Sequence, residues 1–252
     1  MRRRDLLALL PATAIAAALA ACSSGGAASE GASSAATGTA SGSAGAGFPA
    51  TVQTKFGDVT IQSAPQRVVA LGWGDAETAL ALGVQPVGAS DWLGFGGEGV
   101  GPWAKGLYTT APTIIETLEP SYEAIAALRP DLILDTKSSG DQARYERLSQ
   151  IAPTVGVPTG GDSYLTTTSQ QMELVSTEQL DLLDADVVVA FPIFIPTTEI
   201  TGDAAWNALP AVTAQHALVI DGDTSSAFSL GTTLATQYAL EQLVPQLETV
   251  SP

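Results

Sequence analysis

The clearest hydrophobic pattern in the chain lies at residues 123–134, which read EAIAALRPDLIL. Ile125 and Leu128 share one face of a predicted helix, Pro130 ends it, and three aliphatic residues then predict a buried strand. A helix followed by a buried strand is typical of a parallel sheet covered by helices. Residues 178–189, EQLDLLDADVVV, repeat the pattern with the same spacing. The repeat favours two α/β lobes with the same arrangement of helices and strands. Chance similarity of two αβ units is the alternative.

Other hydrophobic patterns predict the elements around this unit. Residues 51–56 and 59–61 alternate between apolar and polar side chains and predict a hairpin. The apolar run 68–71 predicts a buried strand, and the helix after it is expected to start at Asp75 as N-cap and to end at Gly83. We also expect short strands at residues 84–87, 154–157 and 217–220 and a helix over residues 141–151.

The first 21 residues have the form of an export signal. Three arginines precede an apolar run that ends in small residues, and this run is too short and too rich in alanine for a transmembrane span. The small residues before Cys22 resemble the lipobox of bacterial lipoproteins, so we expect Cys22 to be lipidated and to anchor the chain in the membrane. An ordinary signal peptide with an incidental cysteine is the alternative. The arginines also weakly resemble a twin-arginine export motif.

Composition narrows the functional classes. The chain has 252 residues, is 45% hydrophobic and carries a net charge of −16, so it can bury a core but repels nucleic acid and anionic lipid. One cysteine excludes an internal disulfide, and the single histidine, His216, excludes sites that need two imidazoles. No nucleophile elbow and no phosphate-binding loop is present. We therefore expect no enzyme, no catalytic residue, no bound metal and no cofactor.

Candidate ligand contacts come from the rule that open parallel sheets bind ligands beside the carboxyl ends of their strands. Three tryptophans fall in segments that follow predicted strands: Trp73, Trp92 and Trp103. Two of them lie in residues 90–110, a long irregular segment of a kind that is usually functional. Aromatic side chains offer a bulky ligand broad apolar contact, and packing of each loop onto its lobe is the alternative. The other candidates are Lys137, Tyr164, Phe191 and Phe228, whereas Trp206 is assigned to the core.

Five segments, in this order, resemble a known family: APQRVVALGWGDAETALALGVQPVG, EPSYEAIAALRPDLIL, RYERLSQIAPTV, WNALPAV and ALVID. They are similar to the substrate-binding proteins of bacterial ABC importers for ferric siderophores and cobalamin, which are lipoproteins in many envelopes. The resemblance covers residues 48–159 well and residues 177–247 in part. It implies a monomer with two Rossmann-like α/β lobes and parallel sheets, a ligand between the lobes, and delivery of a ferric siderophore to an ABC permease.

The spacing of the repeat departs from that family. Only 55 residues separate Glu123 from Glu178, too few for the rest of the first lobe, a long bridging helix and the start of the second lobe. We infer an internal deletion near residues 175–177, with the second lobe shortened and the bridging helix largely missing; a divergent member of the family whose segments are misaligned is the alternative. The expected organisation is a signal peptide (1–21), a lipidated cysteine and flexible tether (22–47), an N-terminal lobe (48–165), a truncated linker helix (166–177) and an incomplete C-terminal lobe (178–252).

The resemblance also assigns a partner contact. In cobalamin-binding relatives one glutamate per lobe pairs with arginines of the permease, and Glu123 and Glu178 match those positions; favourable charge at a helix start is the alternative. The body from residue 48 onward has only seven Lys and Arg residues, which favours a neutral or cationic ligand such as a hydroxamate siderophore. A cobalamin or haem ligand, and a non-transporting remnant or envelope interaction lipoprotein, remain open as alternatives.

Overall fold

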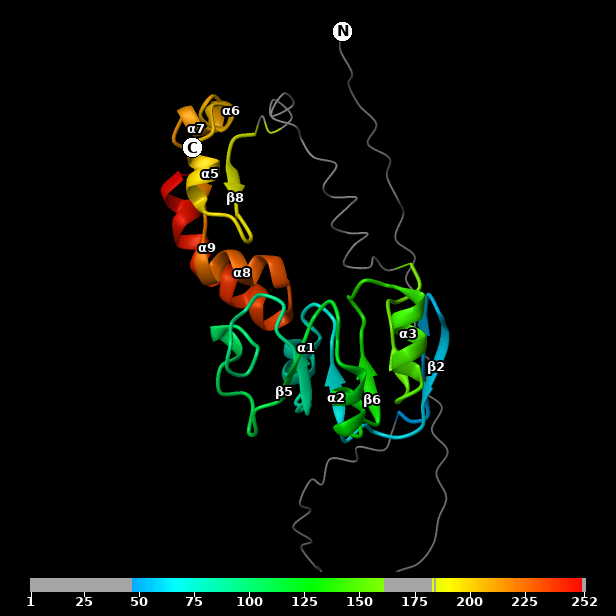
Figure 1. Cartoon of the computed structure of the whole chain (residues 1–252). Coiled ribbons are helices and arrows are strands. Elements are labelled where there is room, and N and C mark those ends of the chain that lie inside the picture. The colour runs from blue at the N-terminus through cyan, green and yellow to red at the C-terminus, as the bar shows by residue number, and fades with distance from the viewer. Residues whose placement is uncertain (1–46, 161–182, 184, 251–252) are drawn as a thin grey trace, which may run out of the picture. The chain divides into compact units, whose positions relative to one another are not determined.

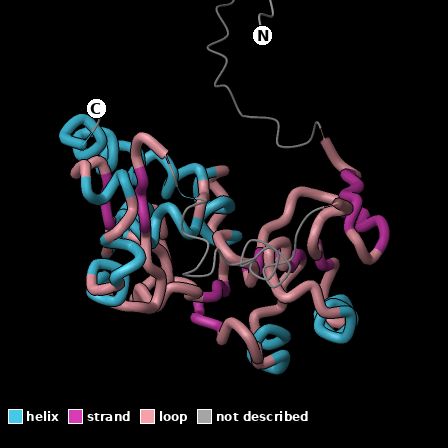
Figure 2. Tube along the Cα trace, turned by 90° about the horizontal axis from the view of Figure 1, so that it is seen from above, coloured by secondary structure: helices cyan, strands magenta, loops and turns pink. Residues whose placement is uncertain are grey.

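The computed structural model describes residues 47–160, residue 183 and residues 185–250, which all belong to one compact unit spanning residues 43–252. The predicted signal peptide, Cys22, most of the tether, Tyr164, Glu178 and the inferred deletion lie outside the described residues. The described strands are short, from two to five residues, and much of the chain between them is loop (Figure 2). Across the described part of the chain, no helix is both long and apolar enough to cross a membrane.

A five-stranded parallel sheet forms the centre of the first half of the body (Figure 1). Its strand order is β5 (Thr113–Ile115), β4 (Gly88–Ser90), β3 (Val68–Ala70), β6 (Leu132–Leu134) and β7 (Thr154–Val155). Strand β3 is central: Val69 is aligned with Gly88 on one side and with Ile133 on the other. All three residues of β3 are buried, as expected for an inner strand of a covered parallel sheet.

The predicted helix and strand at residues 123–134 are confirmed as α2 (Tyr122–Ala127) and β6. The side chain of Ser121 caps α2 by accepting a hydrogen bond from the amide of Ala124, and the chain reverses at Arg129, where φ is 48°. Ile125 and Ile133 are both fully buried in the core cluster that also holds Val69 and Leu148. The helical spacing of the apolar residues, the stop at Pro130 and the apolar run after it were therefore sufficient to predict this unit.

Two further helices and a hairpin complete this half. Helix α1 (Asp75–Ala81) follows β3, and α3 (Gln142–Ser149) begins after Asp141, whose carboxylate caps it through the amide of Arg144 at 2.8 Å. The predicted hairpin is confirmed as β1 (Ala50–Thr54) and β2 (Gly57–Ile61) in an antiparallel pair. Val59 of the hairpin packs with buried residues of the sheet, so the hairpin is part of the same core.

A second, smaller parallel sheet is formed by β8 (Val188–Ala190) and β9 (Ala217–Val219). Between these strands lie α5 (Thr197–Thr201), α6 (Ala204–Asn207) and α7 (Pro210–Thr213), and Trp206 is 8% exposed, which confirms its assignment to the core. Helices α8 (Gly222–Leu230) and α9 (Thr233–Val250) end the described chain. The predicted fold class, α/β with parallel sheets and a smaller second part, is confirmed.

Two local predictions were wrong. The strand expected at residues 84–87 forms at Gly88–Ser90, because the preceding residues turn the chain back from α1 and only the amide of Val87 reaches β3, at the carbonyl of Val68. Asp75 is the first residue of α1 rather than its N-cap; Gly74, with φ 84°, holds the cap position. Strand β5 and the short helix η1 (Pro102–Ala104) were not predicted.

Candidate functional site

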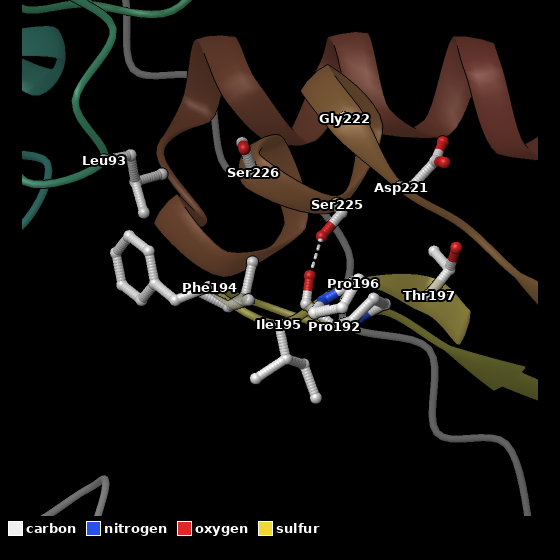
Figure 3. Close-up of a pocket in the computed structure, with 11 residues that line it drawn as sticks. Leu93, Pro192, Phe194, Ile195, Pro196, Thr197, Asp221, Gly222, Ser225 and Ser226 are labelled. Atoms are coloured by element: carbon white, nitrogen blue, oxygen red, sulfur yellow. Dashed lines mark hydrogen bonds between the residues drawn. The ribbon is translucent and has the colours of Figure 1, made fainter. Parts of the chain in front are cut away.

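The carboxyl ends of β8 and β9 open into a pocket of about 390 Å³ (Figure 3). The segment that leaves β8 forms one wall through residues 192–197, and the start of α8, after β9, forms another through Asp221, Gly222, Ser225 and Ser226. Leu93, from the long loop that follows β4, lines the pocket as well. The pocket thus lies where open parallel sheets bind ligands.

The lining combines apolar and polar groups in similar shares. The side chains of Phe194 and Ile195 are 75% and 51% exposed, and the hydroxyl of Ser225 donates a hydrogen bond to the carbonyl of Pro192 at 2.7 Å. This bond ties α8 to the segment that leaves β8 (Figure 3). Phe194 has a φ of 63°, a left-handed conformation that non-glycine residues adopt at a cost and that is common at functional sites.

Two predicted ligand contacts lie beside this pocket. The rings of Phe191 and Phe228 stack with their centroids 5.9 Å apart, and Phe191 is 44% exposed. Phe191 follows β8 directly and Phe228 lies in α8, so the structure brings this pair together next to the pocket walls. Their role in binding a ligand stays a prediction.

A second cavity, of about 560 Å³, lies along the long loop. It is lined by residues of the glycine-rich segment 95–106 and by Asp223 of α8. Its charged residues are Glu98, Lys105 and Asp223. Together with Asp221 of the first pocket, the two cavities present three carboxylates and one lysine. A cationic or neutral ligand therefore fits this charge pattern better than an anion.

The three tryptophans proposed for ligand contact are all engaged within the protein. The indole nitrogen of Trp73 donates to the carbonyl of Ser229 at 3.0 Å, and that of Trp92 donates to the carbonyl of Leu71 at 2.9 Å. Trp73 is 8% exposed in a cluster with buried residues of α8 and α9, and Trp92 and Trp103 pack against this cluster. These contacts are the ones expected if each tryptophan packs its loop onto the protein body. A role of the three tryptophans in ligand binding stays a prediction.

The residue that organises this region is Glu77, which the sequence analysis missed. Its side chain is 2% exposed and accepts hydrogen bonds from the amide of Gly101 at 3.1 Å, the indole of Trp103 at 2.7 Å and the hydroxyl of Thr232 at 2.6 Å. We call Glu77, Gly101, Trp103 and Thr232 the Glu77 hub. It joins α1, the long loop and the start of α9, which are far apart in sequence.

The predicted contact Lys137 lies in the segment that leaves β6. Its carbonyl accepts a hydrogen bond from the amide of Trp73 at 2.9 Å, which joins the segments that leave β3 and β6. Asp75 strengthens this junction, because its buried carboxylate accepts hydrogen bonds from the amides of Gly72 and Thr136 and from the hydroxyl of Thr136. Burial raises the pKa of Asp75 from 3.8 to about 6, although Thr136 works against the shift.

The raised pKa of Asp75 predicts a pH dependence of stability. The folded protein binds this proton more tightly than the unfolded chain does, so the stability that Asp75 contributes is fully present below pH 3.8 and is lost as the pH rises through about 6. The loss is up to about 3 kcal/mol. Urea denaturation between pH 4 and pH 7.5 should show the wild type losing stability relative to Asp75→Asn as the pH rises. A constant difference between the two proteins would contradict the assignment.

Glu123, the predicted permease contact of the first lobe, is exposed in the first turn of α2. Its carboxylate lies 3.4 Å from the hydroxyl of Ser121, the cap of the same helix. Its counterpart Glu178, the predicted ligand contact Tyr164 and the predicted lipidation site Cys22 lie outside the described residues. In the part of the chain that is described, no group of three His, Cys, Asp or Glu residues is placed to hold a metal ion.

The fold is α/β with parallel sheets, and a pocket lies at the carboxyl ends of the strands of the smaller sheet. Residues 68–187 match the family named Periplasmic binding protein. A solved structure, a periplasmic solute binding protein from Mycobacterium smegmatis, has the same fold with a TM-score of 0.61 at 23% identity, and the match covers 79% of this chain and 98% of that one.

Two relatives extend this similarity at the level of sequence. The Fe(3+) dicitrate-binding periplasmic protein FecB of Escherichia coli is 34% identical over 117 residues, which cover 46% of this chain and 38% of FecB. The probable siderophore-binding lipoprotein YfiY of Bacillus subtilis is 40% identical over 100 residues, 38% of this chain and 28% of YfiY. The matches thus span well under half of either relative. The expected resemblance to substrate-binding proteins of ferric-siderophore importers is confirmed.

Proposed function

We propose that this protein captures a ferric siderophore outside the cytoplasm and delivers it to an ABC permease for iron uptake. The observation that carries the proposal is the pocket at the carboxyl ends of β8 and β9, with its mixed apolar and polar lining and the stacked Phe191 and Phe228 beside it. A bulky ligand that exposes both apolar and polar groups gains affinity from such a surface. The similarity to FecB and YfiY supports iron as the cargo, carried within the siderophore and not held by protein ligands.

The charges around the pocket support a hydroxamate siderophore. Ferric dicitrate, the ligand in the name of FecB, is anionic and would need a cluster of arginines or lysines. Of the cations in the described body, Arg144 pairs with a buried carboxylate, and the side chain of Arg67 donates to carbonyls at the end of α2. Among the residues that the structure describes, Lys105 is the one basic residue that lines either cavity. Ferrioxamine B, a hydroxamate complex with a free ammonium group, suits the surrounding carboxylates.

The N-terminal segment supports the proposed location on the outer face of the membrane. Cys22 carries the lipid, residues 23–47 form the tether, and the monomeric body remains on the outer face of the membrane. In the wording of its name, YfiY is also a lipoprotein. Glu123 and Glu178 then meet arginines of the permease, one from each lobe. The domain boundaries given above are part of this proposal.

Tryptophan fluorescence titration tests the choice of ligand. We expect ferrioxamine B to bind more tightly than a ferric catecholate, because the catecholate complex is anionic and meets three carboxylates. Replacing both Asp221 and Asp223 by Asn should weaken ferrioxamine B about five- to tenfold and leave the neutral hydroxamate ferrichrome within about twofold. Asp58→Asn, an exposed change in β2, is the matched control.

The titration also separates the alternatives. Tighter binding of the catecholate would refute the hydroxamate assignment while leaving a siderophore carrier in place. Binding of cobalamin or haem with no siderophore binding would assign those ligands to the same pocket. A protein that binds none of these ligands would be the non-transporting lipoprotein. Because a ligand bound by the native state raises the melting temperature, thermal melts provide an independent readout.

A further inference from the structure

A hollow of about 480 Å³ lies at the edge of the five-stranded sheet and shares no lining residue with the pocket of Figure 3 among the described residues. It is lined by residues 114–119, which include the end of β5 and the turn after it, and by Asp91. Strand β5 pairs only with β4 among the described strands, so this turn stands at an open end of the sheet. We call Asp91 and residues 114–119 the edge hollow.

The edge hollow combines exposed aliphatic side chains with carboxylates. Leu118 is 65% exposed and Ile114 is 44% exposed, although both are large apolar residues. Glu116 and Glu119 are exposed beside them, and none of the described residues that line the hollow is basic. Exposed apolar side chains rimmed by charges of one sign are typical of a surface that meets another protein.

A buried ion pair holds this surface in shape from beneath. Arg144 pairs with Asp135 at 2.9 Å, and both side chains are less than a tenth exposed. The Nη1 group of Arg144 donates to the carbonyls of Thr117 and Leu118, at 3.0 and 3.3 Å. The turn that presents Leu118 is thus pinned to the core, and a partner that binds it loses little entropy in ordering it.

The opposite rim of the edge hollow is fixed in the same way. The carboxylate of Asp91 accepts hydrogen bonds from the amides of Phe95 and Gly96, at 3.0 and 2.7 Å. Asp91 therefore shapes the rim, whereas Glu116 and Glu119 are left to attract a partner. Both rims are formed before any partner arrives.

We propose that the edge hollow is a docking surface for a basic protein segment in which an apolar side chain lies between Lys or Arg residues. The apolar side chain would contact Ile114 and Leu118, and the basic residues would meet Glu116 and Glu119. An anionic membrane surface is the wrong partner for these charges. The assignment of this segment to the permease rests on the proposed function. The contact would then extend from Glu123, the predicted permease contact, across the turn before α2.

Photo-crosslinking tests the surface without any ligand. The full-length lipoprotein, with p-benzoylphenylalanine in place of Leu118, is irradiated in cells and the crosslinked partner is identified by mass spectrometry. We expect an ABC permease subunit, with a yield at least tenfold lower when Glu116 and Glu119 are both changed to Lys. The same probe at Leu240 of α9, which is 48% exposed, is the matched control. No permease crosslink above this control would overturn the proposal.

Uptake of ⁵⁵Fe-ferrioxamine B separates this proposal from the function on which it rests. Leu118→Ser and Glu119→Lys should each lower the uptake rate at least fivefold, with the Kd of the purified protein for ferrioxamine B unchanged. Glu146→Lys, an exposed change on α3, should have no effect. If Glu123→Lys blocks uptake but Leu118→Ser does not, the edge hollow is not the contact. If the purified protein binds no siderophore, the proposed function fails, and the crosslink alone decides the docking surface.

Discussion

Glu77→Ala should lower the free energy of unfolding by about 3–5 kcal/mol, because it leaves the donors of Gly101, Trp103 and Thr232 without their buried acceptor. Hydrogen bonds to a charged group contribute about 1.5–3 kcal/mol each, and their effects in one cluster are not additive. Urea denaturation at pH 7 measures the loss. The emission of Trp103 should also shift to longer wavelength as the long loop separates from α9.

Two comparison variants sharpen the result for the Glu77 hub. Glu77→Gln keeps one acceptor oxygen but places an NH₂ group against donors, so its loss should be intermediate. Glu146→Ala, an exposed glutamate on α3, should stay within about 0.5 kcal/mol of the wild type. An unfolding midpoint of Glu77→Ala equal to that of the wild type would show that the hub adds no net stability.

Arg144→Met should destabilise the protein by a similar amount, about 3–5 kcal/mol, because it strands the buried carboxylate of Asp135. The carbonyls of Thr117 and Leu118 lose their donor at the same time. A double-mutant cycle with Asp135→Asn isolates the charge effect. The double variant should recover about half of the loss, since the uncompensated charge is gone.

The control for the ion pair is Arg147→Met on the same helix. Arg147 is exposed and lies 3.9 Å over the ring of Tyr122, so its loss should cost less than about 1 kcal/mol. Equal stability of Arg144→Met and the double variant would mean that Asp135 is not stranded. Because Arg144 also pins the turn of the edge hollow, its loss should lower the crosslink yield from position 118 as well.

The elements that sequence predicted well are those whose pattern is local. The hairpin of β1 and β2 and the unit of α2 and β6 follow from alternation, apolar runs and a stop at Pro130. Strand β5 escaped prediction because it has three residues, of which Thr113 and Ile114 are exposed. A segment this short shows no alternation of buried and exposed side chains that would predict a strand. Its strand geometry comes from pairing with β4.

The candidate site was predictable only in part. The rule of strand ends selected Phe191 and Phe228, and the pocket opens beside them. It also selected three tryptophans, which pack with α8 and α9 because those helices return to the first half of the body. Glu77 carried no signal, since a glutamate in the first turn of a helix is usually solvated. Its burial depends on Trp103 and Thr232, and Thr232 is 155 positions away.

Sequence by itself determined the parallel α/β class, the position of the αβ unit at residues 123–134 and the family resemblance, because short-range periodicity and ordered segments encode them. Tertiary structure alone decided which polar groups are buried: Glu77, Asp75 and the pair of Asp135 and Arg144. It also decided that the turn at residues 114–119, which carries both acidic and apolar side chains, stays exposed at the edge of the sheet. The physical reason is that burial and hydrogen bonding depend on partners brought from distant parts of the chain, which no local pattern contains.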